Sequence, residues 1–149
     1  MASATGGLTR TLGVARWTVK ELAAIPTVSD GGPEDPAWHP LQHALGIDTF
    51  GANLFIATHA EQQLVEEHDE RESGQQELYF VVEGEAAFQL DGKEARLGRG
   101  GAVAVTDPSV RRSAIALSEG TALLIVGAGP NPFASTWNPS HFTDIPRPD

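Results

Sequence analysis

The sequence predicts an all-β fold, built as a sandwich or a barrel. From Asn53 onward, apolar segments of about five to eight residues, the usual strand length, recur at even spacing. The turn-forming dipeptides Glu83-Gly84 and Asp91-Gly92 separate some of these segments, and the second dipeptide is a strong hairpin signal. We expect strands within residues 53–59, 77–84, 85–92, 93–97, 101–107, 111–118 and 121–128.

The chain before this β region lacks evenly spaced apolar segments. Residues 1–15 are small and polar and predict a flexible terminus. Residues 16–25 predict a short strand followed by a helical turn, which Pro26 ends. Residues 37–46 carry apolar side chains at helical spacing and close on Gly46, so they predict a short helix with a glycine C-cap.

The C-terminal segment, residues 128–149, is too rich in proline for a helix or a central strand and predicts an irregular tail. We expect it to be anchored by three aromatic side chains, those of Phe133, Trp137 and Phe142. Residues 16–149 are thus predicted to form one domain with a core over residues 53–127.

Composition and charge exclude several classes of function. The 149 residues include 10 Lys and Arg against 20 Asp and Glu, which gives a formal net charge of −10 and a pI near 4.8. This excess of acid argues against nucleic acid and anionic membrane surfaces as partners. The absence of cysteine excludes disulfides and thiolate metal sites. No apolar stretch is long enough for a membrane span, and we expect a cytoplasmic protein.

Two motifs add a resemblance to a known family. In the first, Glu77 opens an apolar strand that ends at Gly84. In the second, a glycine turn at Gly101 leads into a strand and Pro108, with Arg112 four residues later. In these features the chain resembles the cupin superfamily, which implies a small jelly-roll barrel, or double-stranded β-helix. Jelly rolls host many unrelated activities, so the resemblance implies a fold more than a function.

The departures from the cupin motifs bear on the cofactor. The family places two histidines before the glutamate of its first motif, and those positions fall here near Arg71 and Ser73. The histidine of its second motif is replaced by Arg112. Of the four usual metal ligands only Glu77 remains, and a guanidinium repels a divalent ion and cannot become a ligand. The resemblance therefore favours no cofactor.

Because both motif residues would meet at one point in a metal-binding cupin, we expect Arg112 to form an ion pair with Glu77 there. Strand alternation places Tyr79 on the same face as Glu77, which predicts a polar trio inside the barrel. A shift of one residue in the register would instead turn Arg111 inward and Arg112 to solvent. Both alternatives stay open at this point.

A metal site remains as an alternative. If residues 71–74 are an insertion, His68 and Glu70 form a His-x-Glu arrangement that could join Glu77 as ligands of a divalent metal. His59, at the end of a predicted strand, could also point inward. This alternative implies a metal-dependent oxygenase or lyase, whereas His68 is otherwise expected to be a solvated residue in an acidic loop.

The leading interpretation is a metal-independent, cupin-like protein that binds a polar or anionic small molecule in its barrel. As an enzyme it would be an isomerase, dehydratase or cyclase in which Glu77 and Tyr79 move protons and Arg112 steadies negative charge. As a non-catalytic binding or sensor module, the same residues, with His59, would hold the ligand without turnover. The sequence leaves open whether the protein is an enzyme.

The expected partners are a small molecule and a second copy of the chain. On the predicted strands, Leu78, Phe80 and Val82 point away from the inner face, as do Ile115 and Leu117. Such a set would be a large exposed apolar patch on a monomer. Cupins often cover such faces by pairing two barrels, so the resemblance implies a homodimer.

Overall fold

The computed structural model describes residues 16–29, 31–32 and 34–148. Within them the chain is almost entirely β, with nine strands in two antiparallel sheets and one short α-helix. The strands are β1 Trp38–His39, β2 Gly51–Ile56, β3 Gln63–His68, β4 Gln76–Glu83, β5 Glu85–Leu90, β6 Lys93–Gly98, β7 Ala102–Val105, β8 Arg112–Ala116 and β9 Ala122–Ala128. The helix α1 covers Leu41–Leu45, and two 3₁₀ turns, η1 and η2, cover Leu22–Ala24 and Pro139–Phe142. The predicted all-β jelly roll is confirmed.

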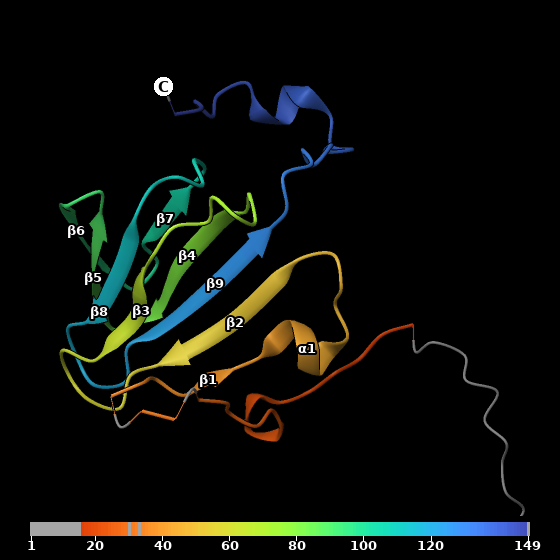
Figure 1. The fold of residues 1–149 in the computed structure, drawn as a ribbon. Helices are drawn as coiled ribbons and strands as arrows, with labels where there is room; N and C mark the ends of the chain where they lie inside the picture. Colours follow the sequence, from red (N-terminus) through yellow and green to blue (C-terminus); the bar gives the residue numbers. More distant parts are fainter. Residues whose placement is uncertain (1–15, 30, 33, 149) are drawn as a thin grey trace, which may run out of the picture.

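The strand order explains how the site is assembled. One sheet has the order β1-β2-β9-β4-β7 and the other the order β3-β8-β5-β6, so neighbours in space are mostly distant in sequence (Figure 1). The buried side chains of both sheets meet in one core, to which Tyr79 of β4 and Phe88 of β5 contribute an edge-to-face pair with ring centroids 5.8 Å apart. The β4 strand therefore contributes both to the core and to the candidate site.

The local signals for turns and caps are confirmed. Asp91 and Gly92, with φ of 49° and 80°, form the two-residue turn between β5 and β6, as a type I′ hairpin turn requires. Gly46 caps α1 in the left-handed conformation, with φ of 74°. The residues before that helix pair with β2 as β1, which was not predicted.

Two expectations about the flanking segments are wrong. Residues 16–25 form no strand, only the turn η1, and their side chains are exposed except that of Ile25, so a strand here would bury no apolar face. The tail is not anchored by its aromatic residues either, since Phe133, Trp137 and Phe142 are 91%, 68% and 46% exposed. The tail runs beyond the end of β9, outside the two sheets (Figure 1).

The outward-facing apolar residues do not form a single patch. Leu78, Phe80 and Val82 lie on β4, whereas Ile115 lies on β8 in the other sheet, and each is a little over one third exposed. A homodimer stays a prediction. Among the described residues, no helix has the length and apolar character needed to cross a membrane.

Candidate functional site

The centre of the candidate site is Glu77, at the start of β4. Strand alternation turns Glu77 and Tyr79 toward the interior, while Leu78 between them faces outward. The Glu77 side chain is only 10% exposed, so its carboxylate needs partners within the protein.

The predicted ion pair between the two sheets is present. Arg112, the first residue of β8, has a side chain that is 1% exposed and places Nη2 3.3 Å from Oε2 of Glu77. Its Nη1 donates a hydrogen bond to the carbonyl oxygen of Val110, at 2.8 Å, while Nε and Nη2 have no hydrogen-bond partner. Arg111 instead faces solvent and pairs with Glu67, so the alternative register does not occur.

Tyr79 provides the second partner, because its hydroxyl donates a hydrogen bond to Oε2 of Glu77. Burial of the phenol, reinforced by the hydrogen bond and the negative charge of Glu77, raises the pKa of Tyr79 well above its ordinary value of 10.0. The positive charge of Arg112 opposes this shift only in part. Tyr79 is therefore a neutral hydrogen-bond donor at physiological pH.

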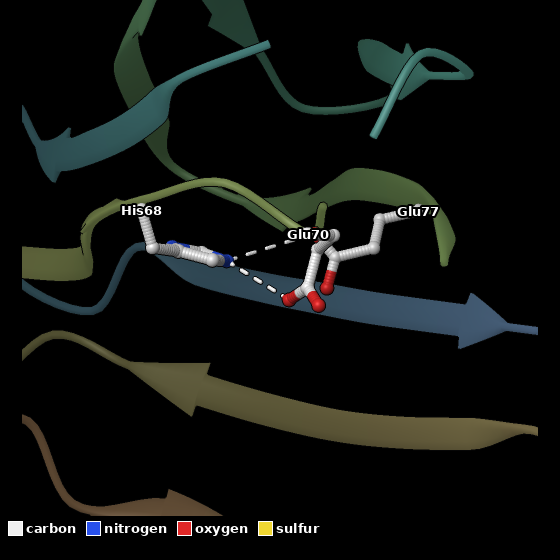
Figure 2. A group of neighbouring side chains, drawn as sticks. All are labelled: His68, Glu70 and Glu77. Carbon is white, nitrogen blue, oxygen red and sulfur yellow. Dashed lines mark ion pairs between the residues drawn. The ribbon is translucent and has the colours of Figure 1, made fainter. Parts of the chain in front are cut away.

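His68 is the third partner and corrects an expectation. It is not in a solvated loop but is the last residue of β3, where it pairs with Arg112 in the ladder. Its Nδ1 lies 2.7 Å from the carbonyl oxygen of Glu66, which fixes the proton on that nitrogen. Its Nε2 consequently faces the carboxylates of Glu70 and Glu77, at 3.3 Å and 3.9 Å (Figure 2).

A cavity of about 330 Å³ opens beside these side chains. Its described lining consists of Asp35, Pro36, Trp38, Asn53, Phe55, Leu64, Val65, Glu66, Glu67, His68, Glu77, Tyr79 and Ile125. Arg112 is not part of this lining, so its guanidinium lies behind Glu77 rather than in the cavity. In this structure the guanidinium contacts Glu77, and its expected role as a direct anion-binding group stays a prediction.

The structure does not bring His59 to the cavity. Strand β2 ends at Ile56, and the chain turns before it reaches His59. The His59 side chain is half exposed, with its Nε2 3.6 Å from the carboxylate of Glu34. The alternation of β2 therefore does not extend to this residue.

Cupins commonly bind a metal ion, and the possible ligands here are His68, Glu70 and Glu77. Their surroundings show whether a divalent ion fits between them. One atom each of His68, Glu70 and Glu77 lie within 4.8 Å of one another, which is close enough for a shared divalent ion. However, Oε2 of Glu77 is already in contact with the Tyr79 hydroxyl and the permanently charged Arg112. An ion bound there would lie a few ångströms from a buried positive charge. A divalent metal does not fit this arrangement.

Comparison with known proteins supports the fold. Neither a protein-family model nor a curated protein matches the sequence. Among solved structures, a cupin protein from Bacteroides fragilis matches with a TM-score of 0.63 at 14% identity, over 82% of this chain and 92% of that one. The chain has the cupin fold.

Two further solved structures with this fold are those of enzymes, an isomerase and a dehydratase. A sugar phosphate isomerase from Silicibacter pomeroyi matches with a TM-score of 0.63 at 18% identity, over 74% of this chain and 75% of that one. Pac13 of Streptomyces, a nucleoside dehydratase, matches with a TM-score of 0.55 at 13% identity, over 75% of this chain and 82% of that one. At these identities the likeness shows the fold alone.

Sequence reasoning missed one wall of the cavity, formed by Trp38, Asn53 and Phe55. A signal for two of them was present, because alternation along β2 places Asn53 and Phe55 on one face, and an asparagine there interrupts an apolar strand. Trp38 had no such signal, since its two-residue strand forms only by pairing with β2.

Tyr79, the only tyrosine in the chain, gives a direct test of the buried site by alkaline titration. The pKa of Tyr79 is raised on folding, so above pH 10 the unfolded chain releases a proton that the folded protein keeps. The contribution of Tyr79 to the free energy of unfolding is therefore complete below pH 10 and is lost as the pH rises above that value. We expect no tyrosinate absorbance from the native protein near pH 10, and ionisation near pH 10 in urea. Ionisation of the folded protein near pH 10 would contradict the buried contact with Glu77.

Replacing Arg112 alone should lower the free energy of unfolding more than replacing both Arg112 and Glu77. Arg112→Met leaves a buried carboxylate without its counter-charge and should lower the free energy of unfolding by about 3 kcal/mol or more. The double variant Glu77→Gln/Arg112→Met should recover most of this loss, as urea denaturation would measure.

A matched control is Arg99→Met, which breaks an exposed pair with Glu83 at 3.7 Å. Its effect should be under about 0.5 kcal/mol. If the losses from the two single substitutions at positions 77 and 112 simply add in the double variant, the two side chains are not coupled and the pair has no energetic role.

Proposed function

We propose that this protein is a metal-independent acid–base enzyme that acts on a polar small molecule in the barrel cavity. One observation carries the proposal: the Glu77 carboxylate lines the cavity while Tyr79, Arg112 and His68 surround it. A group that can accept a proton is thus held in a fixed orientation, with a second proton-carrying group beside it.

The arrangement suits proton abstraction next to a carbonyl. Glu77 would take a proton from the carbon beside that carbonyl, and the electron pair would move onto the carbonyl oxygen to give an enolate. In isomerisation of an α-hydroxy carbonyl compound, the proton returns to the former carbonyl carbon, while the α-hydroxyl proton moves to the former carbonyl oxygen and the hydroxyl becomes the new carbonyl. In dehydration the electron pair of the enolate forms the carbon–carbon double bond, and the β-hydroxyl group leaves with the proton as water. As Glu77 becomes neutral, the negative charge moves to the substrate and remains near the fixed charge of Arg112.

His68 and Tyr79 have different tasks in this scheme. The Nε2 of His68 faces the carboxylates of both Glu77 and Glu70, which lie on the same side of the ring, so it would exchange a proton with either of them (Figure 2). Tyr79 stays neutral and holds the Glu77 carboxylate through its hydrogen bond. The isomerase and the dehydratase among the cupin structures catalyse reactions that move protons, which supports this reaction class.

A non-catalytic binding module is the competing function, since the same cavity would hold a ligand without converting it. The two functions are separated by Glu77→Gln, which keeps the shape of the side chain but cannot take up a proton in the same way. The most general assay for the enzyme is solvent deuterium incorporation, followed by NMR, into a panel of sugars and nucleosides.

We expect Glu77→Gln to lower the rate of exchange or conversion by about a hundredfold or more while ligand affinity is largely kept. The matched control is Glu83→Gln, at the exposed far end of the same strand, which should keep the wild-type rate. Glu77→Asp, which keeps the charge but withdraws the carboxylate, replaces the glutamine variant if that variant unfolds. Wild-type protein that binds ligands but converts none of them would identify a binding module instead.

The alternative of a metal-dependent oxygenase or lyase rests only on the proximity of the ligand atoms of His68, Glu70 and Glu77, and metal analysis tests the poor fit inferred from Arg112. We expect elemental analysis of the untagged protein, dialysed without chelator, to find no stoichiometric iron, zinc, manganese or nickel. An ion that binds only the folded state raises the melting temperature. We expect none of these ions to do so. A stoichiometric ion that is lost in His68→Ala would overturn the metal-independent proposal.

A further inference from the structure

The wall of the cavity formed by β1 and β2 contains two aromatic side chains, those of Trp38 and Phe55. Trp38 and Phe55 face each other across the two strands and stack with ring centroids 5.8 Å apart and an interplanar angle of 24°. Both rings line the cavity. Such a surface suits a ring-shaped ligand with an apolar face.

Asn53 adds an unsatisfied polar group to the same wall. It lies two residues before Phe55 and lines the cavity, yet its Oδ1 is buried without a hydrogen-bond partner among the described residues. Buried carboxamide oxygens normally have a partner, so each exception needs an explanation. Rotation of the carboxamide toward the cavity would let an O–H or N–H group of a ligand satisfy this acceptor.

The charges around the cavity are of one sign. Among its described lining residues the acidic ones are Asp35, Glu66, Glu67 and Glu77, and none is a lysine or arginine. The cation nearest to Glu77, Arg112, is sealed behind that residue, and Arg111 pairs with Glu67 on the exposed surface. The lining is therefore rich in hydrogen-bond acceptors and repels anions.

We infer that the cavity binds an unphosphorylated sugar ring whose apolar face stacks on Trp38 and whose hydroxyl groups donate hydrogen bonds to Asn53 and the carboxylates. The inference rests on the proposed function and names the substrate class of its site. A cavity of about 330 Å³ lies at the small end of ligand pockets and suits one ring rather than two. An amino group on the ring adds to the affinity, whereas a phosphate group lowers it.

The experiment is calorimetry on the full-length protein with a panel of free pentoses and hexoses, each compared with its amino sugar and its phosphate ester. We expect at least one free sugar to bind, its phosphate ester to bind at least about tenfold more weakly, and its amino form to bind no more weakly than the parent. The disadvantage of the phosphate should shrink as salt is added. Tighter binding of the phosphate esters, or no binding by any sugar of the panel, overturns the inference.

Two variants locate the binding surface. Asn53→Leu and Trp38→Leu should each weaken sugar binding about tenfold or more, while Trp137→Leu in the exposed tail should not. Asn53→Leu should also leave the melting temperature unchanged or raised, because it removes an unsatisfied buried acceptor. A lower melting temperature with unchanged affinity would make Asn53 a structural residue and overturn its assignment.

Sugar binding tests the ligand class, whereas Glu77-dependent conversion tests the proposed function. If free sugars bind but Glu77 catalyses no exchange or conversion, the proposed function fails and the ligand class stands. If Glu77-dependent turnover occurs only with phosphorylated substrates, the ligand class fails and the proposed function stands.

Discussion

The site depends on one buried ion pair that joins the two sheets. Arg112 begins β8 in the four-stranded sheet, and Glu77 lies near the start of β4 in the five-stranded sheet, so their contact at 3.3 Å crosses the interior. A pair of this kind is weak evidence for stability, because removing both charges from water costs about as much as their attraction returns. Two nitrogens of the guanidinium also lack hydrogen-bond partners, which weakens the stability argument further. The pair is better explained by what it does to the Glu77 carboxylate.

The first effect of the pair is to fix the orientation of Glu77. Arg112 and the Tyr79 hydroxyl both contact Oε2 of Glu77, and these two contacts hold the carboxylate at the wall of the cavity. A second effect is to occupy the place where a divalent ion would need to bind, so His68 and Glu70 are left beside Glu77 as polar neighbours rather than as ligands. The same residues that would form a metal site thus lie in contact as ionisable groups, which the proposed function uses as proton carriers.

Much of the fold could be predicted from the sequence, because its strands obey simple rules. The resemblance to cupins predicted that Glu77 and Arg112 would meet, and alternation along β4 predicted Tyr79 on the same face as Glu77. The Asp91-Gly92 turn predicted a hairpin. Strand β3 was missed because its sequence, QLVEEH, has only two apolar residues and runs into an acidic loop. The strand that carries His68 could not be predicted, since it follows from the pairing of β3 with β8. The alternative metal site had nevertheless grouped His68 and Glu70 with Glu77, and the structure brings these three together.

The distribution of charge bears on the choice of ligand. An arginine predicted inside the barrel suggests an anion site, and that reasoning holds only if the guanidinium can reach the ligand. Here the guanidinium contacts Glu77 and is absent from the described lining of the cavity, whereas Glu77, Glu66 and Asp35 belong to that lining. The acidic groups of the lining accept hydrogen bonds, and Arg112 contributes its charge through Glu77. Under the proposed function, the positive charge supports the chemistry of the Glu77 carboxylate, and a ligand is selected by its hydrogen-bond donors and an apolar ring face.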